Sequence, residues 1–287
     1  MSILRWINIV ILALMTSTVS AQSISVAIEN PDLLATVTSE ATKAGLIVTS
    51  PSDLTKADNA LCRDAKQWIA TDQVEVMKTL GQQGCQAQIV LIGTPYSYFA
   101  EISSQNTPKN NHWVIPRDRP LNEYQSLLTT LNIHRKVLVI YDDLNLPIDD
   151  NYDHENLKLI KMDQGASPAK IIKKFSSSNV KEIIFLGSHR IVNSNNFLST
   201  LQVAFYKNIA LIGGATPSFI KSGYLIGLFS TDISIANALM TIAQAKDNAA
   251  RKNHILLPKE SKVYANKEVA KYYGFTLQPT WEAVSKK

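Results

Sequence analysis

The chain has few cysteines and lacks the common catalytic and cofactor motifs. Its 287 residues include two cysteines and no Cys-x-x-Cys pair. Gly-x-Ser-x-Gly, Gly-x-Gly-x-x-Gly, a phosphate-binding loop ending in Lys-Ser/Thr and His-Glu-x-x-His are absent. These absences remove the usual sequence support for an esterase, a dinucleotide enzyme, a nucleotide hydrolase or a zinc protease. We therefore expect no enzyme activity, no cofactor and no metal.

Blocks of like charge are also scarce. Charged residues make up 18% of the chain, and the net charge of +5 is thinly spread. The basic groups are small, at Lys170, Lys173 and Lys174 and at the C-terminal Lys286 and Lys287. Such small groups are typical of solvated faces, so we expect no nucleic-acid partner.

The acidic residues of the segment 142–153 lack the spacing and the glycine of a calcium loop. They predict a solvated acidic loop.

Long apolar runs are missing except at the start. Arg5 precedes an apolar core over residues 6–14, and small residues follow, with Val19 and Ala21 at the −3 and −1 positions of a cleavage site. The core is shorter than the roughly 20 residues that a membrane-spanning helix needs. Residues 1–21 therefore predict a cleaved signal peptide and a periplasmic protein. A retained anchor or a buried first helix is the alternative.

Cys62 and Cys85 both lie after the predicted signal peptide. Exported proteins meet an oxidising compartment, and two cysteines allow one intramolecular pairing. We favour a structural disulfide, with two free thiols as the alternative.

Short β-branched runs alternate with helical patterns. Strands are predicted at 23–28, 46–49, 88–92, 112–115, 136–141, 157–160, 182–186, 209–212, 224–229 and 263–265. Helices are predicted at 31–44, 73–83, 97–104, 120–131, 168–175, 195–206, 233–245 and 267–273. About ten strands suit two α/β lobes better than one sheet, each lobe being a mostly parallel sheet flanked by helices. We expect the change of lobe near 116–120.

Polar and small residues follow several predicted strands. Ligands in open α/β sheets bind beyond the carboxyl ends of the strands. The candidate ligand-binding residues at such ends are Asn30, Thr94, Pro95, Tyr96, Asp142, Ser188, His189, Thr216 and Asp232. For any one of these loops taken alone, ordinary turn and helix-cap chemistry is the favoured explanation. Together they predict a polar cleft floored by Thr94, Ser188, His189 and Thr216.

The cleft is expected to bind a solute without converting it. Ser188 and His189 are neighbours whose side chains diverge, and the sequence shows no carboxylate that would orient the histidine. Helices predicted to begin near Thr94-Pro95 and Thr216-Pro217 could hold a carboxylate through free backbone N–H groups. Tyr96 and Trp113 are candidates for an aromatic wall, with ordinary core packing as the alternative for Trp113.

Three stretches resemble a known family. They are the strand and Gly-Thr-Pro turn at 89–95, the segment 217–232 with Phe219, Gly223 and Asp232, and the segment 257–275 with Pro258 and Asn266-Lys267. The chain resembles the substrate-binding proteins of ABC transporters, in the branch similar to tryptophan-binding components, with a periplasmic binding protein type I fold. It departs from that pattern in two places: little chain lies between Thr49 and Gln73, and Ser188-His189 stands where many relatives have an aspartate.

The resemblance implies two lobes that close on a small molecule by a hinge motion. Lobe one is expected at 22–118 with a return segment near 224–250, and lobe two at 119–223 with a C-terminal segment near 258–287. The implied ligand is an amino acid or a similar carboxylate, and the implied partner is the membrane permease of an ABC transporter. The alternative is a periplasmic sensory or regulatory module that signals to a membrane receptor.

Overall fold

The computed structural model describes residues 23–49, 60–104, 112–145, 156–163, 165–176, 180–245 and 255–284. The predicted signal peptide lies outside these residues. Within them, every helix is too short or too polar to cross a membrane.

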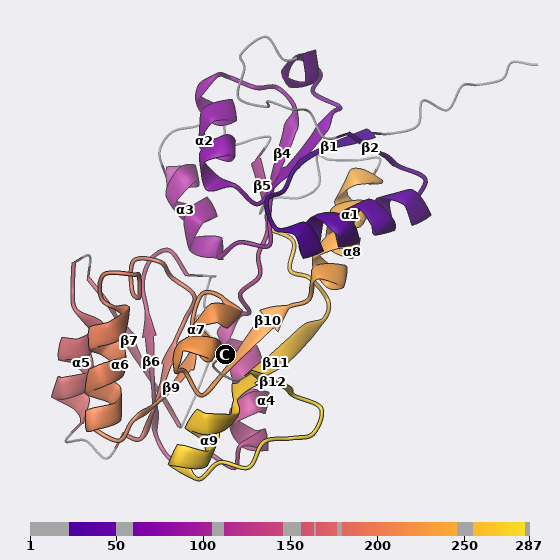
Figure 1. Cartoon of the computed structure of the whole chain (residues 1–287). Coiled ribbons are helices and arrows are strands. Elements are labelled where there is room, and N and C mark those ends of the chain that lie inside the picture. Colours follow the sequence, from indigo (N-terminus) through magenta and orange to yellow (C-terminus); the bar gives the residue numbers. More distant parts are fainter. Residues whose placement is uncertain are drawn as a thin grey trace, which may run out of the picture.

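The first lobe is built on a parallel five-stranded sheet (Figure 1). Its strands, in spatial order, are β2 (Ile47–Thr49), β1 (Ser23–Ala27), β3 (Trp68–Thr71), β4 (Gln88–Ile92) and β5 (His112–Ile115). The apolar run of β4 is buried on both faces, as expected for a central parallel strand.

Helices cover both faces of this sheet. On one face, α1 (Pro31–Lys43) and α8 (Asp232–Ala243) pack together and bury Val37, Leu239 and their neighbours. On the other face, α2 (Val74–Gln82) and α3 (Tyr96–Ser104) bury a second cluster that includes Met77 and Phe99 (Figure 1).

The second lobe is built on a seven-stranded sheet. Its spatial order is β12 (Glu282–Val284), β11 (Ser261–Asn266), β10 (Ile226–Ser230), β9 (Ala210–Gly213), β8 (Glu182–Phe185), β6 (Val137–Tyr141) and β7 (Leu157–Lys161). Neighbouring strands are parallel, except that β10 and β11 are antiparallel. The predicted two-lobed α/β architecture with mostly parallel sheets is confirmed.

Helices also cover both faces of the second sheet. One face carries α4 (Leu121–Thr130) and α9 (Lys267–Tyr273), and the other carries α5 (Pro168–Phe175), α6 (Phe197–Tyr206) and α7 (Pro217–Ser222). In Figure 1, α5 and α6 lie side by side against this second face.

In the described ranges, the chain passes between the lobes three times. It crosses from β5 to α4 through residues 116–120, from β10 to α8 at Thr231, and back from Ile255 to β11. Because β10 pairs within the second sheet, the return into lobe one begins after Ser230. The boundary expected near 224 is therefore too early.

Strand β3 was missed from the sequence. It lies in the centre of the first sheet, between β1 and β4, and its four residues are all buried. The segment between Thr49 and Gln73 looked too short for the additional strand of the family pattern. β3 is a strand within this segment. Trp68-Ile-Ala-Thr71 is too short to show a strand period, and no strong turn signal precedes it.

The predicted disulfide is present. Cys62, in a short 3₁₀ helix (Ala60–Arg63), bonds to Cys85 with an S–S distance of 2.08 Å and a Cα–Cα distance of 4.6 Å. The backbone N–H of Gln86 also donates to the carbonyl of Cys62, at 2.8 Å. These contacts join the start of β4 to the segment that leads into β3.

Candidate functional site

The carboxyl end of β8 in lobe two meets the start of α3 in lobe one. Ser97 Oγ lies 2.9 Å from His189 Nδ1, and the His189 backbone N–H donates to the same hydroxyl at 3.3 Å. The imidazole stacks on the Tyr98 ring, with centroids 4.3 Å apart and planes 4° from parallel. The predicted site residue His189 therefore lies at a direct contact between the lobes.

A carboxylate orients this histidine. Glu101 Oε2 lies 3.0 Å from His189 Nε2, and Glu101 Oε1 lies 3.4 Å from an Arg190 guanidinium nitrogen. The expectation that His189 lacks an orienting carboxylate is wrong. The sequence does show that Ser97 and Glu101 are four residues apart in a predicted helix, so that both lie on one helix face. Nothing in the sequence brings that face to His189, 92 residues from Ser97.

The serine, histidine and glutamate have the order of a catalytic triad, but the contact holds the lobes together. The Ser97 side chain is completely buried between the lobes. Any motion that brings a substrate to its hydroxyl also separates Ser97 in lobe one from His189 in lobe two. The arrangement is therefore suited to closure rather than to nucleophilic attack.

A buried carboxylate occupies the start of α3. Asp118, on the crossover to α4, accepts a hydrogen bond from the Tyr96 backbone N–H at 2.8 Å. Burial raises the pKa of Asp118 to about 7. The burial of Tyr96, and after it the nearby Asp118 charge, raises the pKa of the Tyr96 phenol. Thus the protein itself supplies a carboxylate at the helix start where the sequence predicted a ligand carboxylate.

Gly187 makes this close approach possible. A Cβ atom at Gly187 would lie 2.9 Å from the Asp118 Cβ, so a larger residue would push the β8 loop away from the crossover. The strand-end loop of lobe two is packed directly on the crossover.

Asp232 is also paired within the chain. It stands in the first turn of α8 and accepts a hydrogen bond from Arg117 at 2.6 Å. The Arg117 Nε donates to the Gly93 carbonyl at 3.0 Å. One guanidinium thus ties two crossovers to the end of β4.

Other predicted site residues serve as caps. Asn30 Oδ1 accepts from the N–H groups of Asp32 and Leu33, so it caps α1. Asp142 accepts from the Ser188 hydroxyl at 2.6 Å and from the Leu144 N–H at 2.9 Å. The hydrogen bond between Ser188 and Asp142 joins the loops that follow β8 and β6 in lobe two.

The two threonines differ in their surroundings. Thr94 Oγ1 is buried and has no hydrogen-bond partner among the described residues, whereas Thr216 Oγ1 is paired with Ser218 Oγ at 2.6 Å near the surface. Pro95 is buried directly before α3. Neither Asn30 nor Thr216 has a hydrogen bond to another predicted site residue in the described part of the chain. The floor of Thr94, Ser188, His189 and Thr216 stays a prediction.

Trp113 is not a cleft wall. It is 2% exposed in β5, its ring lies 6.2 Å from that of Trp68, and its Nε1 donates to Gln88. It belongs to the core of lobe one, so the prediction of a cleft position is wrong.

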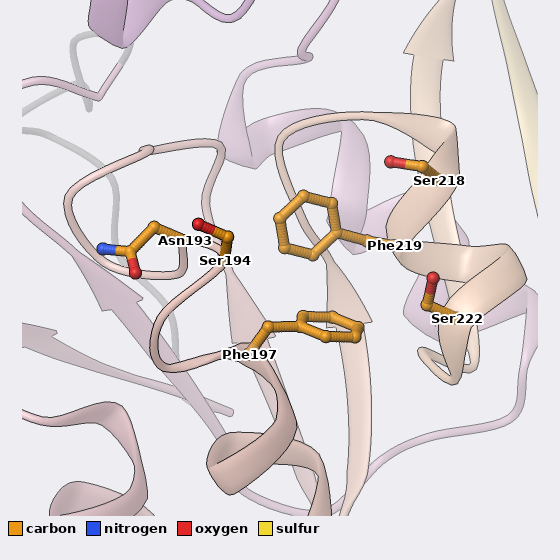
Figure 2. A pocket seen from close by; sticks show the side chains of 6 residues that line it. All are labelled: Asn193, Ser194, Phe197, Ser218, Phe219 and Ser222. Carbon is orange, nitrogen blue, oxygen red and sulfur yellow. The ribbon is translucent and has the colours of Figure 1, made fainter.

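A pocket on lobe two was missed from the sequence. Figure 2 shows the Phe197 and Phe219 rings between serines and Asn193; the rings meet edge to face, with centroids 5.3 Å apart. The cavity is about 230 Å³ and is lined by Asn193, Ser194, Phe197, Ser218, Phe219 and Ser222. It lies where the loops after β8 and β9 lead into α6 and α7, at the carboxyl edge of the second sheet. Phe197 and Phe219 are separated by a strand in the sequence, so spacing could not reveal that their rings meet.

The described residues include no group of three or more histidine, cysteine, aspartate or glutamate side chains that could hold a metal ion.

Comparisons with known proteins bear on the fold. No family profile and no curated protein sequence matches the chain. One similar structure is the ligand-free, open form of CD0873, a substrate-binding protein with adhesive properties from Clostridium difficile. It has a TM-score of 0.59 and 10% sequence identity, and the match covers 93% of this chain and 99% of that one. This chain shares its overall fold with that protein.

A second similar structure has a bound ligand. It is an ABC domain in complex with L-Trp from Streptococcus pneumonia, with a TM-score of 0.50 and 10% identity over 91% of this chain and 99% of that one. The resemblance to periplasmic binding proteins of type I is therefore confirmed for the fold, across almost the whole length of the chain.

Proposed function

We propose that the chain is an extracytoplasmic solute-binding protein that takes a small molecule between its lobes and delivers it to the membrane permease of an ABC transporter. The observation that supports this proposal is the two-lobed fold, which the chain shares over 93% of its length with a substrate-binding protein. Three short crossovers join the lobes, and such connections allow hinge closure around a ligand. The predicted signal peptide supports a periplasmic location.

The solute class follows from the pocket on lobe two. Phe197 and Phe219 offer aromatic surface, and the serines with Asn193 offer hydrogen bonds. Arg190 follows β8 as well, but it lines a separate pocket with Asp142, Asp143 and Asp163, so the carboxylate part of the proposal comes from the resemblance and not from this pocket. We propose an amino acid or a similar small carboxylate, as the resemblance implies, with an apolar or aromatic group that this pocket would hold.

A thermal-shift screen tests this proposal. A ligand at 100 times its dissociation constant stabilises the folded protein by about 2.7 kcal/mol, which is visible as a higher melting temperature. Amino acids and small carboxylates with apolar groups are expected to produce this rise. The Phe219→Ala variant should lose most of the rise, because it removes one wall of the pocket.

The matched control is Tyr272→Ala. Tyr272 is also an aromatic residue, 62% exposed on α9 and absent from the pocket. It should keep the full ligand response. No response to any compound in the screen would contradict the solute class, and steady conversion of a compound to product would contradict a binding function.

A sensory or regulatory module that signals to a membrane receptor is the second candidate. The direct contact of Ser97 with His189 favours it, because the lobes meet through their own side chains. Reconstitution with the permease separates the two functions. Stimulation of transport by the solute-loaded protein supports delivery, whereas binding to a receptor domain without such stimulation supports signalling.

A further inference from the structure

The contact between α3 and the β8 loop is built around an imidazole that can gain a proton. Ser97, Tyr98 and Glu101 come from lobe one, and His189 comes from lobe two. We propose that Ser97, Glu101 and His189 form an inter-lobe latch that holds the lobes closed while the imidazole is neutral and releases them when it takes up a proton. The latch acts on the lobe motion itself and needs no solute.

The hydrogen bonds fix the tautomer of the neutral ring. The Glu101 carboxylate can only accept, so the ring hydrogen lies on Nε2. Nδ1 is then an acceptor for the Ser97 hydroxyl hydrogen at 2.9 Å. The hydroxyl oxygen in turn accepts the His189 backbone N–H at 3.3 Å. In this state each polar atom of the contact is satisfied.

A second proton on the ring disturbs this arrangement. Nδ1 becomes a donor, so the Ser97 hydroxyl must turn its own hydrogen elsewhere. The hydrogen bonds of the described residues give this hydroxyl no partner besides the two His189 nitrogens, and the side chain is fully buried. A buried donor without an acceptor destabilises the closed arrangement. Opening the lobes exposes both groups to water and removes the conflict.

The charges around the ring act in both directions. Glu101 on α3 and Asp142 at the end of β6 favour the imidazolium, while Arg190 on the same loop opposes it. Asp118 lies under the neighbouring Gly187, and the uncharged Tyr98 ring covers one face. Burial outweighs the two carboxylates and lowers the pKa of His189 below its ordinary 6.5.

The sign of the pH effect follows. A lowered pKa in the closed state means that the latch is fully formed above pH 6.5. Its contribution is lost as the pH falls through the lower pKa of the closed state. As the pH falls from 6.5 to the pKa of the closed state, the ratio of open to closed molecules rises by up to about tenfold for each pH unit.

An inter-lobe distance measurement tests the latch in the complete mature chain. Glu75 on α2 and Leu198 on α6 are well exposed, on opposite lobes, and suit spin labels after replacement by cysteine. Pulsed electron spin resonance without solute should give a short distance at pH 8 and a growing population of long distances as the pH falls below 6.5.

Three variants separate the latch from other titrating groups. His189→Gln cannot take up a proton and should remove the pH dependence of the distance. Glu101→Gln keeps an oxygen for Nε2 but loses the charge that favours the imidazolium, which lowers the pKa of His189 in the closed state further. Opening should still begin near pH 6.5, continue to a lower pH and reach a larger open population than in wild type. His134→Gln is the matched control, because His134 is exposed in the loop after α4 and bonds only to Asn132 among the described hydrogen bonds. It should behave as wild type.

A distance that stays constant from pH 8 to pH 5 would overturn the proposal. So would an unchanged pH response in His189→Gln, provided that circular dichroism shows the variant to be folded. Because the measurement uses no solute, its result is independent of the thermal-shift screen. If the distance responds to pH but no compound raises the melting temperature, only the proposed solute class is contradicted.

Discussion

At the scale of single residues, the strand-end side chains mostly serve the protein's own architecture. Asn30 caps α1, Asp142 holds Ser188, and Asp232 pairs with Arg117. The sequence predicted that polar residues gather at these ends, because the alternation of strands and helices fixes where strands end. It could not predict their partners, since Asp232 and Arg117 are 115 residues apart.

Asp118 should make stability depend on pH. Burial raises its pKa from 3.8 to about 7, so the folded protein binds a proton that the unfolded chain releases. Stability is therefore expected to fall as the pH rises from 3.8 to 7. Asp118→Asn should raise the free energy of unfolding at pH 8 by on the order of 3 kcal/mol and change it little at pH 4.

Urea unfolding at the two pH values measures this difference. The asparagine still offers an oxygen to the Tyr96 N–H, so the start of α3 keeps its hydrogen bond. A variant that is less stable than wild type at pH 8 would show that the Asp118 charge supports the fold.

At the scale of secondary structure elements, most helices and strands were predicted within a few residues. Period and caps were informative for α1, whose Asn30 cap and Pro31 mark its start. β3 was missed because burial of a four-residue strand depends on β1 and β4 beside it. The inter-lobe contact of α3 was also missed, because local sequence does not specify which surface of the protein packs against a helix.

The disulfide should stabilise the region before β3. Cys62 and Cys85 are separated by 23 residues, a loop whose closure is worth about 3 kcal/mol in the unfolded state. The double variant Cys62→Ser, Cys85→Ser should lose about that much stability in urea unfolding. Thiol titration of the unfolded, unreduced wild type should detect no free thiol, and two free thiols would contradict the bond.

At the scale of the whole molecule, the two lobes are interleaved along the chain. Lobe one needs α8, which packs on α1 and follows ten of the strands in sequence. The Gln244 side chain also donates to the Ala44 carbonyl, 200 residues away. The two-lobed plan was predictable from the number of strands, but this packing was not visible in the sequence.

A chain that ends at Ser230 should therefore fail to complete lobe one. Without α8, the apolar face of α1 around Val37 loses its cover. The same cut removes β11, α9 and β12 from lobe two, so both lobes are left incomplete. We expect the truncated chain to bind the dye ANS and to lose cooperative thermal unfolding. A matched truncation after Val284, which removes the last three residues, should melt as the full chain does. A folded, ANS-negative truncation at Ser230 would contradict the role of α8.

The packing of α8 on α1 also sets an order in time. A chain emerging from the ribosome reaches α8 after about four-fifths of its length has been made, and until then the core of lobe one cannot close. The proposed periplasmic location would require the chain to stay unfolded while it crosses the membrane. Placing a helix of the first lobe so late delays the folding of that lobe. Under the proposed export, the contact that completes lobe one would therefore also set when the chain loses its competence for translocation.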